Sequence, residues 1–410
     1  MPSRVTIVTA GHLATCPRML KAADTLHESG YDVRVISTQQ TPWAVEADRQ
    51  LHARRGWRWE CVRYDRAGAP WQWLTTGARF RAAQALSRYV ASARRPGLAA
   101  RAFSRVHPEI VAAILCEKQD FIYGGTSGAL AAVAEASRRS GTPCALDFED
   151  FHCAEHGDTA HGTLRDALAA TIMADALRQA AFVTVGSAAI GRACEERFAI
   201  RPVTINNVFL LPHAPAGDDA GGPLRLYWFS QTIGPGRGLE DVVRAVGEAR
   251  IPAELHLRGV PIQSYFGELA ALSQAAAPRL KLVQHPTSDP DGMVDACRGF
   301  DVGLTVEPGT TLNNALCLPN KALTYPLAGL ALAATRTAGQ RVLTDHLGDD
   351  AISYAPGRVA DLAAGLARWH DDRQALRRAK AASWNAACQR WRWDHPLERD
   401  TLLAAVRAVA

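Results

Sequence analysis

The chain lacks a hydrophobic run long enough to cross a membrane. No apolar stretch in its 410 residues reaches the roughly 18–20 residues that a spanning helix needs. Residues 1–8 lead directly into an expected strand and carry no apolar core of a signal peptide. We therefore expect a cytoplasmic protein.

Paired cysteines and nucleotide-binding fingerprints are also missing. The nine cysteines are odd in number and show no C-x-x-C spacing, which supports neither a disulfide framework nor a zinc site. No segment has G-x-G-x-x-G or Walker A spacing, so a dinucleotide or ATP site is only weakly supported. Asp289-Pro290-Asp291 has the form of an Asp-x-Asp metal motif, but Asp and Pro are ordinary helix-start residues, and we predict no metal site there.

The length and the order of elements predict two α/β domains. A chain of 410 residues is too long for one ordinary core. Expected strands and helices alternate from position 4 to position 198 and again after position 224, which predicts parallel sheets covered by helices on both faces. The expected division is residues 1–211 as the first domain, 212–223 as a Pro/Gly-rich linker, 224–388 as the second domain, and 389–410 as a helical end that packs back on the first domain.

Basic residues are unevenly distributed along the chain. The net charge is only +5, yet positions 51–107 contain twelve arginines, four tryptophans and two acidic residues, Glu60 and Asp65. One interpretation is a solvated basic surface with tryptophans in the core. The other is a patch that meets anionic lipid headgroups or a lipid-linked substrate. The sequence leaves both open.

The most informative segment is Pro319-Asn320-Lys321, which begins a short helix ahead of a glycine break and a buried strand. The first turn of a helix has unpaired backbone N–H groups and a partial positive charge, so it can hold a phosphate. Lys321 would add a positive charge at that point. The alternative is an ordinary connection with a solvated lysine.

A glycine-rich loop follows the expected strand 224–229. Gly234 and Gly236 allow the backbone to approach a phosphate closely, and Arg237 can pair with it through two hydrogen bonds. The alternative is a plain glycine turn. In parallel sheets, loops after strands are where ligands bind.

Two loops of the first domain occupy comparable positions. Gly11 and His12 follow the first strand, and Glu149, Asp150 and His152 follow the strand that ends near Asp147. The carboxylates and the imidazole could supply a general base or orient sugar hydroxyls. The alternatives are a structural histidine and an acidic helix start.

Together these segments resemble GT-B-fold glycosyltransferases, in particular the family 4-like bacterial sugar transferases. The resemblance covers essentially the whole chain. The segment from Pro17 to Val33 resembles the family's opening strand–loop–helix, Arg237-Gly238-Leu239-Glu240 its basic turn, and the segment from Pro319 to Gly329 its most specific motif. The family usually has a glutamate on the ribose where this chain has Thr324.

The resemblance implies two Rossmann-like domains that face each other across a cleft and transfer a sugar from a nucleotide-sugar donor. It implies retention of anomeric configuration, no metal, and no cofactor beyond the donor substrate. The expected partners are that donor and a carbohydrate or lipid-linked acceptor of bacterial polysaccharide or glycolipid assembly, with an anionic membrane surface as a further option and no nucleic acid.

The resemblance also assigns roles to residues. Donor binding is expected at Gly234, Gly236, Arg237, Asn320, Lys321 and Thr324, acceptor binding at Gly11, His12 and Arg18, and catalysis at Glu149, Asp150 and His152. Two other functions remain open, a sugar-nucleotide epimerase of the same fold and a non-catalytic subunit that binds nucleotide or a protein partner.

Overall fold

A computed structural model describes residues 3–89, 95–157, 159–215 and 221–410. The chain divides into two compact units, Met1–Asn206 with Arg399–Ala410, and Asn207–Glu398. The division at Asn206 precedes the expected linker, 212–223, of which 216–220 lies outside the described residues. No helix in the described part of the chain is long and apolar enough to span a membrane.

The first unit is built on a seven-stranded parallel sheet of order β3-β2-β1-β4-β5-β6-β7. Its strands are β1 Arg4–Thr9, β2 Asp32–Gln39, β3 Arg58–Arg63, β4 Phe121–Gly125, β5 Cys144–Phe148, β6 Ala180–Val185 and β7 Val203–Thr204. Its helices are α1 Pro17–Glu28, α2 Pro42–Ala53, α3 Pro70–Tyr89, α4 Pro96–Phe103, α5 His107–Leu115, α6 Leu130–Ser140, α7 Ala160–Ala176, α8 Ala188–Phe198 and α16 Arg399–Arg407.

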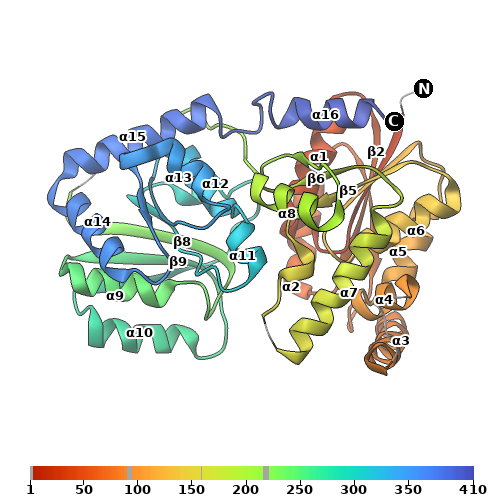
Figure 1. The fold of residues 1–410 in the computed structure, drawn as a ribbon, viewed down its shortest axis with the longest axis horizontal. Coiled ribbons are helices and arrows are strands. Elements are labelled where there is room, and N and C mark those ends of the chain that lie inside the picture. Colours follow the sequence, from red (N-terminus) through yellow and green to blue (C-terminus); the bar gives the residue numbers. More distant parts are fainter. Residues whose placement is uncertain (1–2, 90–94, 158, 216–220) are drawn as a thin grey trace. The chain divides into compact units, whose positions relative to one another are not determined.

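The second unit has a six-stranded parallel sheet of order β10-β9-β8-β11-β12-β13. Its strands are β8 Leu224–Ile233, β9 Ala253–Pro261, β10 Leu280–His285, β11 Val302–Thr305, β12 Ala331–Thr335 and β13 Ile352–Tyr354. Its helices are α9 Leu239–Ala249, α10 Tyr265–Ala276, α11 Leu312–Leu316, α12 Asn320–Leu327, α13 Arg341–Leu347, α14 Val359–Asp371 and α15 Arg373–Gln389. Helices α9 and α10 lie on one side of this sheet and α12 and α15 on the other (Figure 1).

Burial on both faces explains why the strands are so apolar. Every residue of β4, β5 and β12 is buried, as expected for parallel strands covered by helices on both sides. Small residues keep the packing close: a Cβ on Gly303 in β11 would lie 2.1 Å from the ring of Tyr325. Because Gly303 leaves this space, α12 can lie against the sheet with Tyr325 donating to the Leu304 carbonyl at 3.1 Å.

The strand order reverses at one point in each sheet, between β1 and β4 and between β8 and β11. The connections that leave such a point diverge to opposite faces of the sheet, which leaves a crevice at the carboxyl ends of the strands. The loops after β1, β8 and β11 are therefore the places where a ligand is expected.

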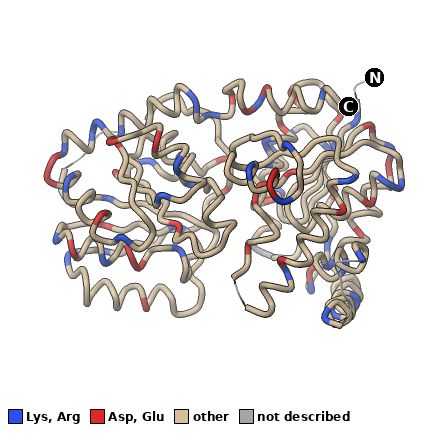
Figure 2. Tube along the Cα trace, in the orientation of Figure 1, with Lys and Arg blue, Asp and Glu red and all other residues tan. Residues whose placement is uncertain are grey.

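Thr15 lies two residues before Pro17, a position that predicts a cap for the first long helix, but the structure differs. Its hydroxyl donates to the His12 carbonyl at 2.9 Å, and Cys16 precedes α1 without any side-chain cap. The C-terminal helix α16 belongs to the first unit, where Arg399 pairs with Glu28 at 3.1 Å. The helix-start residues Asp289 and Pro290 predict a helix near positions 292–298, but the structure has only the short 3₁₀ turn Asp295–Cys297 there. Basic and acidic residues are interspersed over both units (Figure 2).

Candidate functional sites in the two units

The second unit brings the expected donor-binding residues together at the carboxyl edge of its sheet. Gly234, Gly236 and Arg237 follow β8, and Glu307 follows β11, the strand paired with β8. The positive charge of Arg237 contributes to the electrostatic field at the Glu307 carboxylate. Asn320 and Lys321 begin α12, and Lys321 contacts the same carboxylate.

The glycines of the loop differ in what they permit. Gly236 and Gly238 both have positive φ, +72° and +74°, a conformation that L side chains rarely adopt. A Cβ on Gly238 would lie 2.0 Å from the Val306 carbonyl oxygen, whereas nothing lies within 4 Å of one on Gly236. Gly238 therefore lets the β8–α9 turn approach the β11 loop, and Gly236 supplies only the backbone conformation.

Lys321 is not the mobile surface charge that the sequence suggested. Its ammonium is buried and donates to Glu307, and it lies 5.4 Å from the ring centre of Trp228. Asn314 also donates to Glu307, at 3.1 Å. Burial acts to raise the pKa of Glu307, but Lys321, Asn314 and the charge of Arg237 hold that pKa below its usual value.

The remaining residues expected to bind the donor contact the start of α12. Pro319 precedes α12 and provides no side-chain cap for its first N–H groups. The Asn320 side chain accepts a hydrogen bond from Asn207 at 2.7 Å, which holds the start of the helix. The buried hydroxyl of Thr324 donates to the Asn320 carbonyl at 2.7 Å, so in this structure it serves the helix backbone.

In the first unit, His12 bridges two loops. Its Nε2 accepts from the backbone N–H of Thr41 at 3.1 Å and of Gln40 at 3.3 Å. Its Nδ1 lies 2.8 Å from Asp48 and therefore carries the proton that this carboxylate accepts. The ring is buried and fixed in one tautomer, so it ties the loop after β1 to the loop after β2. Gly11, beside it, packs closely against Cys16 and Thr15.

Arg18 is committed to the interior of the first unit. It makes two hydrogen bonds to Asp147, at 2.8 and 2.6 Å, and a third to the Ile205 carbonyl. Asp147 also accepts from Thr184, which bonds to Tyr123 at 2.7 Å. This network joins α1 to β4, β5 and β6.

The expected catalytic cluster lies just after β5. Burial, together with Asp150 and Asp147, raises the pKa of Glu149 to about 7, although Arg18 and Lys21 act in the opposite direction. A carboxyl group with this pKa can exchange a proton near neutral pH.

His152 is buried and its Nδ1 pairs with Glu155. Burial acts to lower the pKa of His152, but the carboxylates of Glu155, Asp150 and Asp147 raise it overall. The ligand atoms of Asp150, His152 and Glu155 lie within 4.8 Å of one another, close enough to share a metal ion. Asp289 instead accepts from the Gly292 N–H at 2.7 Å and shapes a turn.

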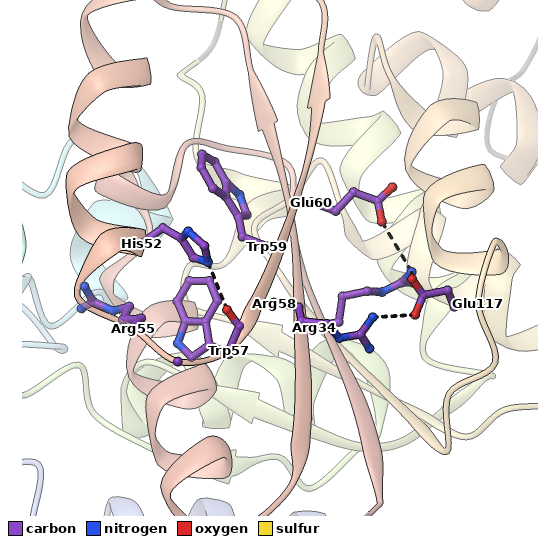
Figure 3. Close-up of a pocket in the computed structure, with 9 residues that line it drawn as sticks. Arg34, His52, Arg55, Trp57, Arg58, Trp59, Glu60 and Glu117 are labelled. Carbon is purple, nitrogen blue, oxygen red and sulfur yellow. Dashed lines mark hydrogen bonds and ion pairs between the residues drawn. The ribbon is translucent and has the colours of Figure 1, made fainter.

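A separate pocket of about 610 Å³ lies at the amino ends of β2 and β3 in the first unit (Figure 3). Its charged side chains pair with each other: Arg34 with Glu60 and Glu117, each at 3.4 Å, and Arg58 with Glu117 at 2.8 Å. These pairs, and the position away from the carboxyl edge of the sheet, distinguish it from the candidate sites.

The sequence analysis did not identify two carboxylates that organise these sites, Asp48 and Glu307. Glu307 lies two residues beyond a buried strand, a position that could have identified it. Asp48 lies inside α2, and its partner His12 is 36 residues away, so no local pattern connects them.

Solved structures similar to this chain include glycosyltransferases and proteins in complex with UDP. HepE of Anabaena, in complex with UDP and glucose, superimposes with a TM-score of 0.68 at 15% identity, over 99% of this chain and 98% of that one. TarM of S. aureus, in complex with fondaparinux, α-GlcNAc-glycerol and UDP, gives 0.69 at 7% identity, covering 99% of each chain.

Sucrose-phosphate synthase of Thermosynechococcus elongatus gives a TM-score of 0.68 at 12% identity, over 99% of this chain and 98% of that one. No protein-family model matches the sequence, and no curated protein matches it. The chain therefore has the GT-B fold, with α/β units built on parallel sheets, as its sequence predicted.

Proposed function

We propose that this protein is a glycosyltransferase that uses a nucleotide-sugar donor. The observation that carries the proposal is the convergence of Arg237, the α12 start and the Lys321–Glu307 pair at one edge of the second unit's sheet. A departing nucleoside diphosphate develops negative charge, and fixed donors at this edge would stabilise it. Arg237 supplies the charge, and α12 supplies backbone N–H groups.

Lys321 and Glu307 have different parts in this proposal. Because Glu307 neutralises Lys321 locally, the pair adds little net charge for a diphosphate. Glu307 fixes the position of the Lys321 ammonium, while Arg237 and the start of α12 provide most of the stabilisation of the negative phosphate charge. Asn320 and Thr324 hold the first turn of α12 in place, and Gly234 and Gly236 let the β8 loop approach the phosphates.

In the first unit, Glu149 is the proposed proton acceptor, with Asp150 and His152 beside it. Gly11, His12 and Arg18 would shape the surface that binds a carbohydrate or lipid-linked acceptor. Retention of configuration, independence from metal, and a role in bacterial polysaccharide or glycolipid assembly in the cytoplasm are parts of the same proposal. The family resemblance supports them.

Calorimetric titration with UDP and UDP-glucose tests the donor site, since HepE of Anabaena is known in complex with each. Arg237→Ala should weaken UDP binding on the order of tenfold, the effect of one charge-assisted hydrogen bond. Arg244→Ala is the matched control, because Arg244 is an exposed α9 arginine that pairs with Asp241. Equal affinities for wild type and Arg237→Ala would refute the phosphate assignment.

Lys321→Ala is a less direct test. It leaves the buried Glu307 without its cation, and such a loss typically costs about 3–5 kcal/mol of stability. Reduced UDP binding in that variant should therefore be interpreted only alongside its unfolding curve.

The proposed transferase and its two alternatives, an epimerase and a non-catalytic subunit, differ in what they do to the donor. A transferase releases UDP only when an acceptor is supplied, apart from slow hydrolysis, whereas an epimerase changes the donor by itself. A non-catalytic subunit would bind UDP and turn over no donor. The Thr324 hydroxyl donates to the backbone of its own helix, which is a reason to test the non-catalytic function in the same assay.

A further inference from the structure

The arginine- and tryptophan-rich stretch, residues 51–107, has two parts with different surroundings. The first part contains Arg55, Trp57 and Arg58, and the second is α3. In the first part, Trp57 is buried and its indole N–H donates to Asp24 at 2.7 Å. Arg55 pairs with the same carboxylate at 3.2 Å, and Arg58 pairs with Glu117 at 2.8 Å. These charges are balanced locally, so this part does not form a basic patch.

The second part, α3, presents apolar side chains to solvent. Trp71 is 80% exposed and Tyr89 88% exposed, and Leu74 and Leu86 are about half exposed. At ~100° per residue, these four positions fall within about 60° of one direction around the helix axis. The exposed alanines on the same side are Ala78, Ala82 and Ala85. Thr75 is the exposed polar residue on this side, and its hydroxyl donates to the Trp71 carbonyl at 2.9 Å. We call the seven apolar residues the apolar face of α3.

The opposite side of α3 holds the helix to the first unit. Its buried residues are Thr76, Gly77, Ala83 and Ser87. Arg105 donates to the Thr76 hydroxyl on this side at 2.9 Å, and Arg79, on the flank of the helix, pairs with Glu109 at 2.7 Å. Since these contacts secure the helix, the apolar face is not needed to hold the fold together. An exposed apolar surface without a structural role indicates an interaction site.

The charges of α3 indicate the kind of partner. The helix Pro70–Tyr89 contains no aspartate or glutamate. Arg81 and Arg88 are exposed and lie beside the apolar face, 80–100° around the axis from its centre by the same ~100° geometry. A second copy of the chain would place arginines opposite arginines, and like charges disfavour that pairing. A negatively charged partner suits this surface.

We propose that α3 is an interfacial helix that docks on an anionic lipid surface, with its apolar face among the headgroups and acyl chains. Trp71 and Tyr89 lie at its two ends, ~27 Å apart at ~1.5 Å per residue, and Trp and Tyr favour the membrane interface. Arg81 and Arg88 would contact lipid phosphates. This inference goes beyond donor binding and does not depend on it.

Cosedimentation with vesicles tests the proposal. The full-length protein should bind vesicles of phosphatidylcholine mixed with phosphatidylglycerol, bind phosphatidylcholine alone much less, and release at high salt. Arg88→Gln combined with Tyr89→Ser should lower the partition coefficient on the order of tenfold. Arg341→Gln combined with Val342→Ser is the matched control, an exposed arginine and apolar neighbour on α13.

Three results would overturn the proposal. One is equal binding to both vesicle types or to neither, and another is an equal loss in the control variant. The third is a dimer, seen by light scattering, that the α3 variant converts to monomer. UDP titration of the same variants distinguishes lipid docking from donor binding. If the α3 variant keeps its UDP affinity and loses vesicle binding, the result supports lipid docking by α3. If the wild type does not bind UDP, the result contradicts only the proposed function.

Discussion

At the scale of single residues, buried carboxylates decide what the candidate side chains can do. Lys321, Arg18 and His12 each donate a hydrogen bond to a buried carboxylate, respectively that of Glu307, Asp147 and Asp48. Removing one partner of such a pair leaves the other buried without compensation. Substitutions at these positions will therefore change stability as well as ligand binding, and Arg237 is the better probe of the site.

Glu149 gives a prediction about pH. Because its pKa is about 7 in the folded protein and 4.5 in its ordinary state, the folded state retains this proton to higher pH than the unfolded state does. Its contribution to stability is thus present below about pH 4.5 and is lost as pH rises to 7. Glu149→Gln lacks that loss, so relative to wild type it should be more stable at pH 8 than at pH 5, by on the order of 2 kcal/mol.

Urea unfolding of the two proteins at pH 5, 6, 7 and 8 measures this difference. Glu196→Gln, which removes an exposed carboxylate on α8, is the control and should follow wild type throughout. A constant offset between Glu149→Gln and wild type across this range would contradict the raised pKa.

At the scale of elements, two close approaches build the proposed donor site. The β8–α9 turn meets the β11 loop at Gly238, and α12 meets β11 at Gly303. Each glycine lies where a Cβ would overlap another element. The positions of the β8–α9 turn and of α12 therefore depend on these two contacts more than on the intrinsic helix preference of α12. The eight-residue α12 contains Pro326 and is held by packing.

Substituting the two turn glycines distinguishes the cost of backbone strain from the cost of steric overlap with the β11 loop. Gly236→Ala and Gly238→Ala both place alanine at positive φ, which costs roughly 1 kcal/mol. Only Gly238→Ala also brings a Cβ to 2.0 Å from the Val306 carbonyl oxygen. We expect Gly238→Ala to lose several-fold more UDP affinity and more stability than Gly236→Ala, by calorimetry and thermal unfolding. Equal losses in the two variants would mean that the close approach to β11 is unimportant.

At the scale of the whole molecule, each unit carries its own core and its own polar network. The second unit's core runs from Leu224 on β8 to Ala379 on α15, with Trp228 and Trp369 fully buried. The first unit's network centres on Asp147. A ligand held by one unit should therefore first protect backbone amides of that unit.

Hydrogen exchange can locate donor binding along the chain. UDP alone should slow exchange in residues 230–239 and 307–325 of the second unit, because the diphosphate would engage the N–H groups of these loops. Residues 144–155 of the first unit should change less. Protection confined to the first unit would contradict the assignment of the donor site, and Arg237→Ala should remove the effect in the second.

The sequence by itself determined the α/β class and the repeated alternation of strand and helix, because these follow from local hydrophobic periodicity and glycine and proline signals. It also predicted the glycine-rich loop after β8, since loops that follow strands lie at the ligand-binding edge of a parallel sheet. The Pro319-Asn320-Lys321 segment predicted the start of α12. A pattern read over a few residues is sufficient for such features.

Only the tertiary structure decided how the candidate side chains are used. Lys321 meets Glu307 across 14 residues, His12 meets Asp48 across 36, and Arg18 meets Asp147 across 129. The same holds for the arginine-rich stretch, whose first part is neutralised by distant acids while α3 keeps an exposed apolar face. Burial and pairing depend on which segments the sheets bring together, and no local pattern carries that information.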